Sequence, residues 1–177
     1  MASAAAKRYK ELKNKQAAIN KALEKTGKTA LKEMVVEFFA EHPDLLSFSW
    51  TQYTPYWNDG DVCVFSAATD YPAVTFKAKD GKVLTFDENF AGYVDEEGEE
   101  IDVLPSKIHT VEGVYDENTK FEETKDPYEK QVNSLVKAVT NFLKPFDDDD
   151  LLTMFGDHQK VTVKRNGKIE TEDYEHE

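Results

Sequence analysis

Two dipeptides, Asp80-Gly81 and Asn166-Gly167, constrain the fold of this chain more than any other feature of its sequence. Each lies between two segments in which apolar and polar side chains alternate: residues 74–79 and 82–86, and residues 161–165 and 168–171. Such alternation is typical of a strand that buries one face, and both dipeptides favour a tight turn, of type I′ for Asp80-Gly81. The sequence therefore predicts two antiparallel β-hairpins.

Other segments extend this sheet. Residues 47–53 and 62–67 also alternate and are joined by the turn-forming residues 55–60, which predicts a third hairpin. Further candidate strands lie at residues 108–115 and 120–123. We expect residues 87–107 to form an acidic segment with little regular structure, and residues 172–177 to fray.

Apolar side chains recur at helical spacing in three other segments. Residues 5–25 contain no Pro or Gly, Gly27 can cap that helix, and Thr29 can begin a second helix that ends before Pro43. A third helix is predicted at residues 132–143, before Pro145, and the acidic residues 147–150 can cap a short helix after them. The predicted fold class is α+β: an antiparallel sheet of hairpins packed against helices, with an N-terminal helical hairpin.

Charge divides the chain into two parts. Residues 1–28 carry eight Lys or Arg and two Glu, so the total of −13 leaves a net charge of −19 for residues 29–177. Fourteen acidic residues and three lysines lie within residues 87–126. We therefore predict a basic amphipathic helix over residues 1–27 and a single acidic α+β domain over residues 28–177. An acidic body repels nucleic acid and anionic lipid and attracts basic protein surfaces.

Several classes of protein are disfavoured by what the chain lacks. No apolar run approaches the ~20 residues of a membrane span, and no charged region precedes the Ala-rich start, so we expect a cytoplasmic protein without membrane contact. Cys63 is the single cysteine, which excludes an internal disulfide and a cysteine-based zinc cluster. The four histidines show no metal-ligand spacing and phosphate-binding glycine motifs are absent, so we predict neither a metal nor a cofactor.

The segment from Trp50 to Asp61 combines four large aromatic side chains with Asn and Asp. Neighbouring side chains of a strand point to opposite faces, so these aromatics cannot all enter one core, and some are expected at a surface. The segment resembles a signature of small uncharacterised proteins of tailed bacteriophages and bacteria. This resemblance covers about residues 44–66. It implies a phage or mobile-element origin, and hence a location in the host cytoplasm, but no particular activity.

These residues form a candidate binding site, which comprises Trp50, Gln52, Tyr53, Tyr56, Trp57, Asn58, Asp59 and Asp61. In a functional interpretation, the aromatic faces stack on a base or sugar and the carboxylates offer hard oxygen ligands. In a structural interpretation, the Asn, Asp and Gly residues satisfy the backbone of a tight connection and the aromatics form a minor core. A catalytic carboxylate pair could be drawn from Asp59, Asp61, Asp87 and Glu88. With 35 acidic residues in the chain, however, such pairs arise by chance.

The basic first helix also has two interpretations. Its residues Ala5, Tyr9, Leu12, Gln16, Ile19 and Leu23 are spaced alternately by four and three, which is a heptad seam with one polar interruption. The helix either binds nucleic acid or an acidic partner, or it lies on the acidic body of its own chain or of a second copy. We favour the latter, with a homo-oligomer formed through residues 5–25, because a basic helix on a −19 body would bind nucleic acid weakly.

Three functions follow from these patterns. The first is a non-enzymatic accessory or interaction protein of a phage, which binds a host protein through an acidic surface. The acidic stretch from Asp87 to Asp126 is either an ordinary solvated face or an array that imitates the charge of nucleic acid. The second is a small metal-dependent hydrolase centred on the loop from Tyr56 to Asp61. The third is an oligomeric structural component. We favour the first, and therefore expect a protein partner and no enzymatic activity.

Overall fold

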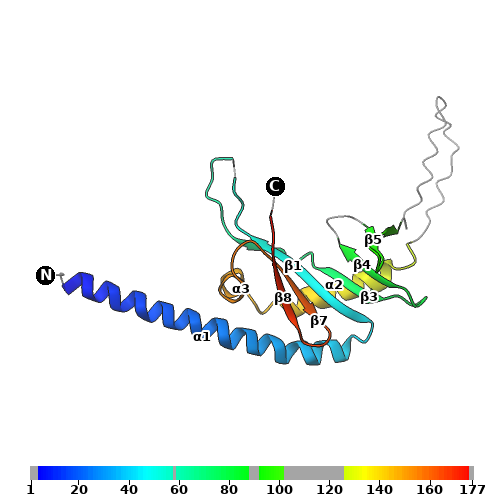
Figure 1. Cartoon of the computed structure of the whole chain (residues 1–177), viewed down its shortest axis with the longest axis horizontal. Helices are drawn as coiled ribbons and strands as arrows, with labels where there is room; N and C mark the ends of the chain where they lie inside the picture. The colour runs from blue at the N-terminus through cyan, green and yellow to red at the C-terminus, as the bar shows by residue number, and fades with distance from the viewer. Residues whose placement is uncertain (1–3, 58, 88–91, 102–125, 176–177) are drawn as a thin grey trace.

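A computed structural model of the protein describes residues 4–57, 59–87, 92–101 and 126–175 and confirms the α+β class (Figure 1). The elements are, in chain order, α1 (Ala4–Glu41), β1 (Leu45–Tyr53), β2 (Ser66–Ala67), β3 (Ala73–Lys77), β4 (Val83–Asp87), β5 (Gly92–Val94), β6 (Glu100–Ile101), α2 (Glu129–Leu143), α3 (Asp148–Phe155), β7 (Gln159–Lys164) and β8 (Ile169–Asp173). The strands form one antiparallel sheet in the order β6-β5-β4-β3-β1-β7-β8, and β2 also pairs with β1. Strand β1 is therefore central, with β3 on one side and β7 on the other.

The helices pack on one face of the sheet. Phe48 of β1 lies against Phe38 and Phe39 of α1 and Phe142 of α2, with ring centroids 5.7–5.8 Å apart. The next inward side chain, Trp50, meets Phe155 of α3 at 5.7 Å. Aromatic contacts of this kind contribute about 0.5–1.5 kcal/mol each beyond the burial of area. The core is therefore centred on alternate residues of β1.

Arg165, at the turn after β7, fixes the end of α1. Its guanidinium donates hydrogen bonds to the carbonyl oxygens of Phe39, His42, Pro43 and Leu45 at 2.8–3.1 Å. The last carbonyls of a helix have no partner within the helix, and a cation there also interacts favourably with the helix dipole. One side chain thus joins the C-terminal end of α1, the start of β1 and the last hairpin.

The predicted N-terminal helical hairpin is wrong, because residues 4–41 form one continuous helix. Gly27 lies inside this helix instead of capping it, and the Thr29 hydroxyl donates to the Lys25 carbonyl oxygen within the same helix. Gly27 faces α3, and a Cβ atom added to it would lie 2.6 Å from Sδ of Met154. The glycine therefore permits close contact between two helices and does not end the first of them.

The predicted hairpins at Asp80-Gly81 and Asn166-Gly167 are confirmed as β3–β4 and β7–β8. The type I′ turn is wrong, since only Gly81 of its pair has a positive φ, at +92°. Ala78 N donates to Lys82 O and Gly81 N donates to Ala78 O, which makes a three-residue connection with Gly in the left-handed position. The Asp80 carboxylate accepts from Lys82 N and stabilises this longer turn.

Of the other predicted elements, some are confirmed and some differ in the structure. Helices α2 and α3 are confirmed, and Asp147 caps α3 by accepting from Asp150 N. In the third hairpin, the second strand is only Ser66–Ala67, so residues 62–65 lie outside it. The acidic segment 87–107 contains β5 and β6, contrary to the expectation of little regular structure. The candidate strands at 108–115 and 120–123 lie outside the described residues.

Replacing Gly27 by Leu tests the contact between α1 and α3. Leu is a better helix former than Gly, but the new side chain must displace buried Met154, so we expect a loss of about 1–3 kcal/mol in the free energy of unfolding. Urea denaturation followed by tryptophan fluorescence measures it. Ala17→Leu, on the exposed part of α1, is the matched control and should change stability by less than about 0.5 kcal/mol. Equal effects of the two substitutions would contradict this account.

Candidate functional site

The eight residues of the candidate site divide into buried and exposed groups. Trp50 and Gln52 are buried under α3, and Gln52 is 0% exposed. Trp50 Nε1 donates to Gln52 Oε1 at 3.0 Å. Gln52 Nε2 in turn donates to the carbonyl oxygens of Gly156, at 2.6 Å, and Leu151, at 3.2 Å. These contacts give both side chains a structural role in joining β1 to the end of α3.

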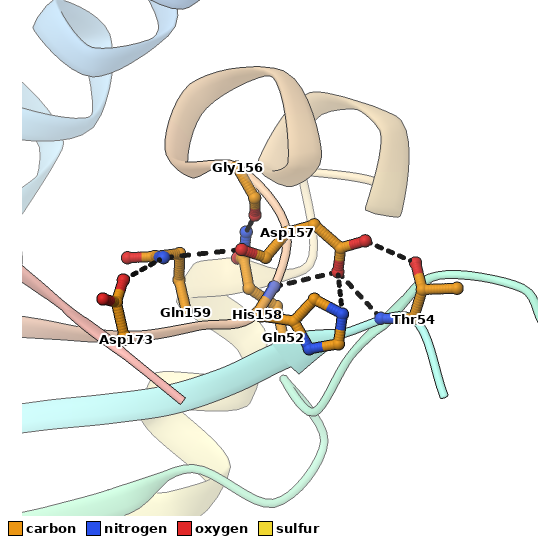
Figure 2. A network of polar contacts seen from close by, with 7 residues as sticks. All are labelled: Gln52, Thr54, Gly156, Asp157, His158, Gln159 and Asp173. Atoms are coloured by element: carbon orange, nitrogen blue, oxygen red, sulfur yellow. Dashed lines mark hydrogen bonds and ion pairs between the residues drawn. The ribbon is translucent and has the colours of Figure 1, made fainter. Parts of the chain in front are cut away.

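Asp157, just after α3, binds Thr54, the first residue after β1 (Figure 2). Its Oδ1 accepts from Thr54 N and from His158 N, both at 2.8 Å, and its Oδ2 accepts from the Thr54 hydroxyl at 2.7 Å. Desolvation raises the pKa of the Asp157 carboxyl, but the hydrogen bonds from Thr54 and His158 outweigh it, and the pKa lies below its ordinary value of 3.8. The ionised carboxylate therefore fixes the point at which the chain leaves β1.

His158 provides a platform beside this carboxylate. The ring of Tyr56 stacks on the His158 ring with centroids 4.7 Å apart and planes 13° apart. His158 adopts a left-handed φ of +53°, an uncommon conformation for a residue other than Gly. Its carbonyl oxygen accepts from Tyr174 N, and the Tyr174 ring lies 5.7 Å from that of Tyr53. One face of the Tyr56 ring thus packs on His158, although most of the Tyr56 side chain is exposed.

The loop between β1 and β2, residues 54–65, carries the exposed half of the candidate site and extends away from the sheet in Figure 1. Trp57 is 76% exposed, and its Nε1 donates to Oδ1 of Asp59 at 3.2 Å. Val62 and Val64 on the same loop are 81% and 69% exposed. Asp59 and Asp61 are exposed as well, whereas Asn58 lies outside the described residues. Large apolar side chains therefore face solvent on a loop whose base is anchored.

No sequence motif indicates the anchor of this loop. Thr54 and Asp157 are separated by 103 positions, and neither residue belongs to a motif. Tyr56 and His158 likewise meet only because β1 and β7 pair, with Gln52 opposite Gln159. The aromatic density of residues 50–57 correctly indicated surface exposure, but it could not separate the buried Trp50 from the exposed Trp57.

A second candidate surface lies on α1. All side chains of residues 6–26 are exposed, including Tyr9, Leu12, Ile19 and Leu23 of the predicted heptad seam. Figure 1 shows this part of α1 extending beyond the sheet at its N-terminal end. The helix therefore does not lie across the acidic body of its own chain, which was one of the two arrangements favoured from the sequence.

The described acidic groups are unevenly paired. Lys164 and Lys168 both contact Glu170 at 2.6 Å, and their hydrogen bonds lower the pKa of Glu170 to about 2. The acidic turn between β5 and β6 differs: the side chains of Glu96, Glu97, Glu99 and Glu100 are exposed and have no ion-pair partner within the part of the chain that the structure describes. The acidic surface therefore includes carboxylates that form no ion pair with a described cation, although Lys82 lines the same pocket as Glu96 and Glu97.

Two further findings concern the described residues. Among them, no group of three or more His, Cys, Asp or Glu side chains is arranged to hold a metal ion. Within the same part of the chain, none of the helices combines the length and the apolar character required to cross a bilayer.

Replacing Gln52 by Leu tests its structural role. Leu fills a similar volume but leaves Trp50 Nε1 and the Leu151 and Gly156 carbonyls without their buried partner, so we expect a loss of about 2–4 kcal/mol in the free energy of unfolding. Gln159→Leu removes hydrogen bonds at a more exposed position and should cost less than about 1 kcal/mol. Urea denaturation compares the two. A near-neutral Gln52→Leu would show that these hydrogen bonds do not hold β1 to α3.

Replacing Asp157 by Ala tests the anchor of the loop. The carboxylate loses two hydrogen bonds from Thr54 and one from His158 N, which we expect to lower the free energy of unfolding by about 1–2 kcal/mol at neutral pH. Because the folded-state pKa is depressed, the contribution of Asp157 is complete above its ordinary pKa of 3.8 and is lost as the pH falls through the lower, folded value. The stability difference between wild type and variant, measured by denaturation from pH 7 downward, should shrink below that point. Asp70→Ala, at an exposed carboxylate, should show no such difference.

The segment from Trp50 to Asp61 thus comprises a buried part, which belongs to the core, and an exposed part, which belongs to the anchored loop. Its resemblance to small phage proteins stays a prediction. Comparison with known proteins finds no matching family model, and no curated protein or solved structure that is significantly similar to this chain.

Proposed function

We propose that the protein is a non-enzymatic interaction protein that binds a second protein, with the loop of residues 54–65 as its docking surface. The observation that carries this proposal is the exposure of Tyr56, Trp57, Val62 and Val64 on one anchored loop. Single exposed apolar side chains are ordinary on protein surfaces, but several on one loop mark a site of interaction.

The side-chain types on the loop favour a protein partner. Trp and Tyr dominate the affinity of protein interfaces, because each buries a large area and loses few rotamers on binding. The Asp157 anchor and the stack of Tyr56 on His158 hold the base of the loop before a partner arrives. A surface that is already ordered loses less conformational entropy on association.

Charge favours a basic partner. The loop contains Asp59 and Asp61 and neither Lys nor Arg, and it belongs to a body of net charge −19. Charges around an apolar centre steer the encounter and select the partner, while the apolar centre supplies affinity. The exposed carboxylates of the turn between β5 and β6, which form no ion pair with any described cation, add to this field, and imitation of the charge of nucleic acid is one form that such recognition can take.

The resemblance of the Trp50–Asp61 segment to small phage proteins suggests the origin of the partner. A phage accessory protein would meet host proteins, and host enzymes that act on nucleic acid present basic grooves. The proposed partner is therefore a basic host protein. The hydrolase centred on Tyr56–Asp61 stays an alternative prediction. It is distinguished by replacing Asp59 and Asp61 with Asn, which would abolish hydrolysis but leave docking through the aromatics largely intact.

Affinity capture from bacterial lysate tests the proposal. Immobilised wild-type protein should retain a basic protein at low salt and release much of it at high salt, because screening weakens the attraction. Tyr56→Ala and Trp57→Ala should each weaken binding of that protein by about 2 kcal/mol, as expected for aromatic residues at the centre of an interface. Isothermal titration with the purified partner measures the loss.

Tyr9→Ala provides the matched control, since Tyr9 is a tyrosine on a different surface that is 64% exposed, compared with 72% for Tyr56. It should leave the affinity for the captured protein unchanged. Loss of binding in Tyr9→Ala but not in Trp57→Ala would contradict docking through the loop. Capture that does not depend on salt would contradict the role of charge.

A further inference from the structure

We infer that residues 6–26 of α1 form a recognition arm for an acidic amphipathic helix of another protein. This surface is separate from the loop at residues 54–65, and the inference does not depend on the function proposed for that loop. It follows from three properties of the arm: its exposure, its narrow apolar seam and the sign of the charges beside the seam.

The arm has little support from its own chain. Every side chain from residue 6 to residue 26 is exposed, whereas Leu31, Val35 and Phe39 further along the same helix are buried. The contacts within the arm are local, such as the 2.8 Å hydrogen bond from Gln16 Nε2 to Asn20 Oδ1. In proteins, most of the stability of a helix comes from packing its apolar stripe on another element. A helix with an exposed stripe is therefore suited to pack on a partner.

The exposed apolar side chains of the arm form a narrow stripe along one side of the helix, called the seam here. Tyr9 and Leu12, followed by Gln16 and Ile19 and then Leu23, occupy alternate a and d positions of a heptad repeat. A strict a/d stripe is the pattern of a coiled coil, and a single polar residue at an a position fixes register at some cost in stability. Tyr9, Leu12 and Ile19 are each more than 60% exposed, so the seam is open to a partner helix.

The charges beside the seam select the partner. In this register Arg8 and Lys15 occupy g positions and Lys13 occupies an e position, and no acidic residue lies at e or g between residues 8 and 22. Pairing of e and g charges decides which helices associate in a coiled coil. In a parallel pair of identical arms, Arg8 of one copy would face Lys13 of the other. In an antiparallel pair the flanks are positive on both sides as well, so pairing with the arm of a second copy is disfavoured and an acidic helix is favoured.

Charge alone does not account for the arm. Lys7, Lys10 and Lys21 lie at outward b and f positions, so basic residues surround the helix. A polyanion such as duplex nucleic acid would use all of these cations equally and would leave the apolar seam unused. An acidic coiled-coil partner uses the seam together with its flanks, and the outward lysines contribute little. Nucleic acid and an acidic helix thus differ in which basic residues of the arm contribute to their binding.

A synthetic peptide provides the probe. It is a three-heptad helix with Leu and Ile at the a and d positions and Glu at the e and g positions, labelled for fluorescence anisotropy and titrated with the full chain. We expect wild-type protein to bind it, and the triple variant Arg8→Glu, Lys13→Glu, Lys15→Glu to bind at least about tenfold more weakly, because attraction becomes repulsion at three flanking sites. The double variant Leu12→Asp, Ile19→Asp should lose binding.

The matched control changes the same number of charges on the outward face. The variant Lys7→Glu, Lys10→Glu, Lys21→Glu should weaken binding by less than about threefold, since these side chains do not flank the seam. Circular dichroism checks that both charge variants keep their helix content. An equal loss in the two charge variants would overturn the inference, because binding would then follow net charge alone.

Two competing occupants give distinct results. If sedimentation equilibrium shows a wild-type dimer that Leu12→Asp, Ile19→Asp abolishes, and the peptide fails to displace it, the seam belongs to a second copy and the inference is wrong. If a duplex oligonucleotide binds more tightly than the acidic peptide, and the inward and outward variants lose affinity for it equally, the arm is a nucleic-acid binder and the inference is again wrong.

Discussion

The hydrogen bonds of the buried Gln52 side chain are the interaction on which the rest of the structure depends. Gln52 lies in the central strand β1, which pairs with β3 on one side and with β7 on the other. Its amide joins Trp50 in the same strand to the last turn of α3. Two positions later the chain leaves the sheet at Thr54, which is held by Asp157 immediately after that turn. The position of the exposed loop is therefore set by the way β1 is fastened to α3.

The sequence predicted the parts of the fold that local chemistry determines. The two hairpins at Gly81 and Gly167, and helices α2 and α3, follow from turn residues, periodicity and caps that lie within a few positions of one another. The error at Gly27 has a tertiary cause, because the contact with Met154 that requires a glycine there is made by a helix over 100 positions away. The two short strands β5 and β6 were missed for a similar reason. The register of β5 comes from pairing with β4 and that of β6 from pairing with β5, and their acidic turn carries no apolar alternation.

The candidate site shows the same division. Aromatic density in residues 50–57 indicated that some of these side chains reach a surface, and Tyr56 and Trp57 do so. Which aromatics are buried depends on the phase of the alternation along β1, and the presence of a partner for Gln52 depends on where α3 ends. The anchor formed by Thr54 and Asp157 depends on the pairing of β1 with β7. A single sequence carries no local record of contacts that arise between such distant segments.

The buried half of α1 has a consequence for its exposed half. Forming the first turn of a helix is costly, whereas each added residue costs little. Residues 27–41 pack on the sheet and on Met154, and Arg165 donates a hydrogen bond to the Phe39 carbonyl near their C-terminal end, so the body stabilises this part of the helix. Residues 6–26 then need only continue a helix that already exists. A partner that packs on this arm would meet an ordered surface, and the association would keep the free energy that a disordered segment loses on folding. Gly27, which lets α1 pack closely on α3, therefore also helps to keep the arm helical before a partner binds.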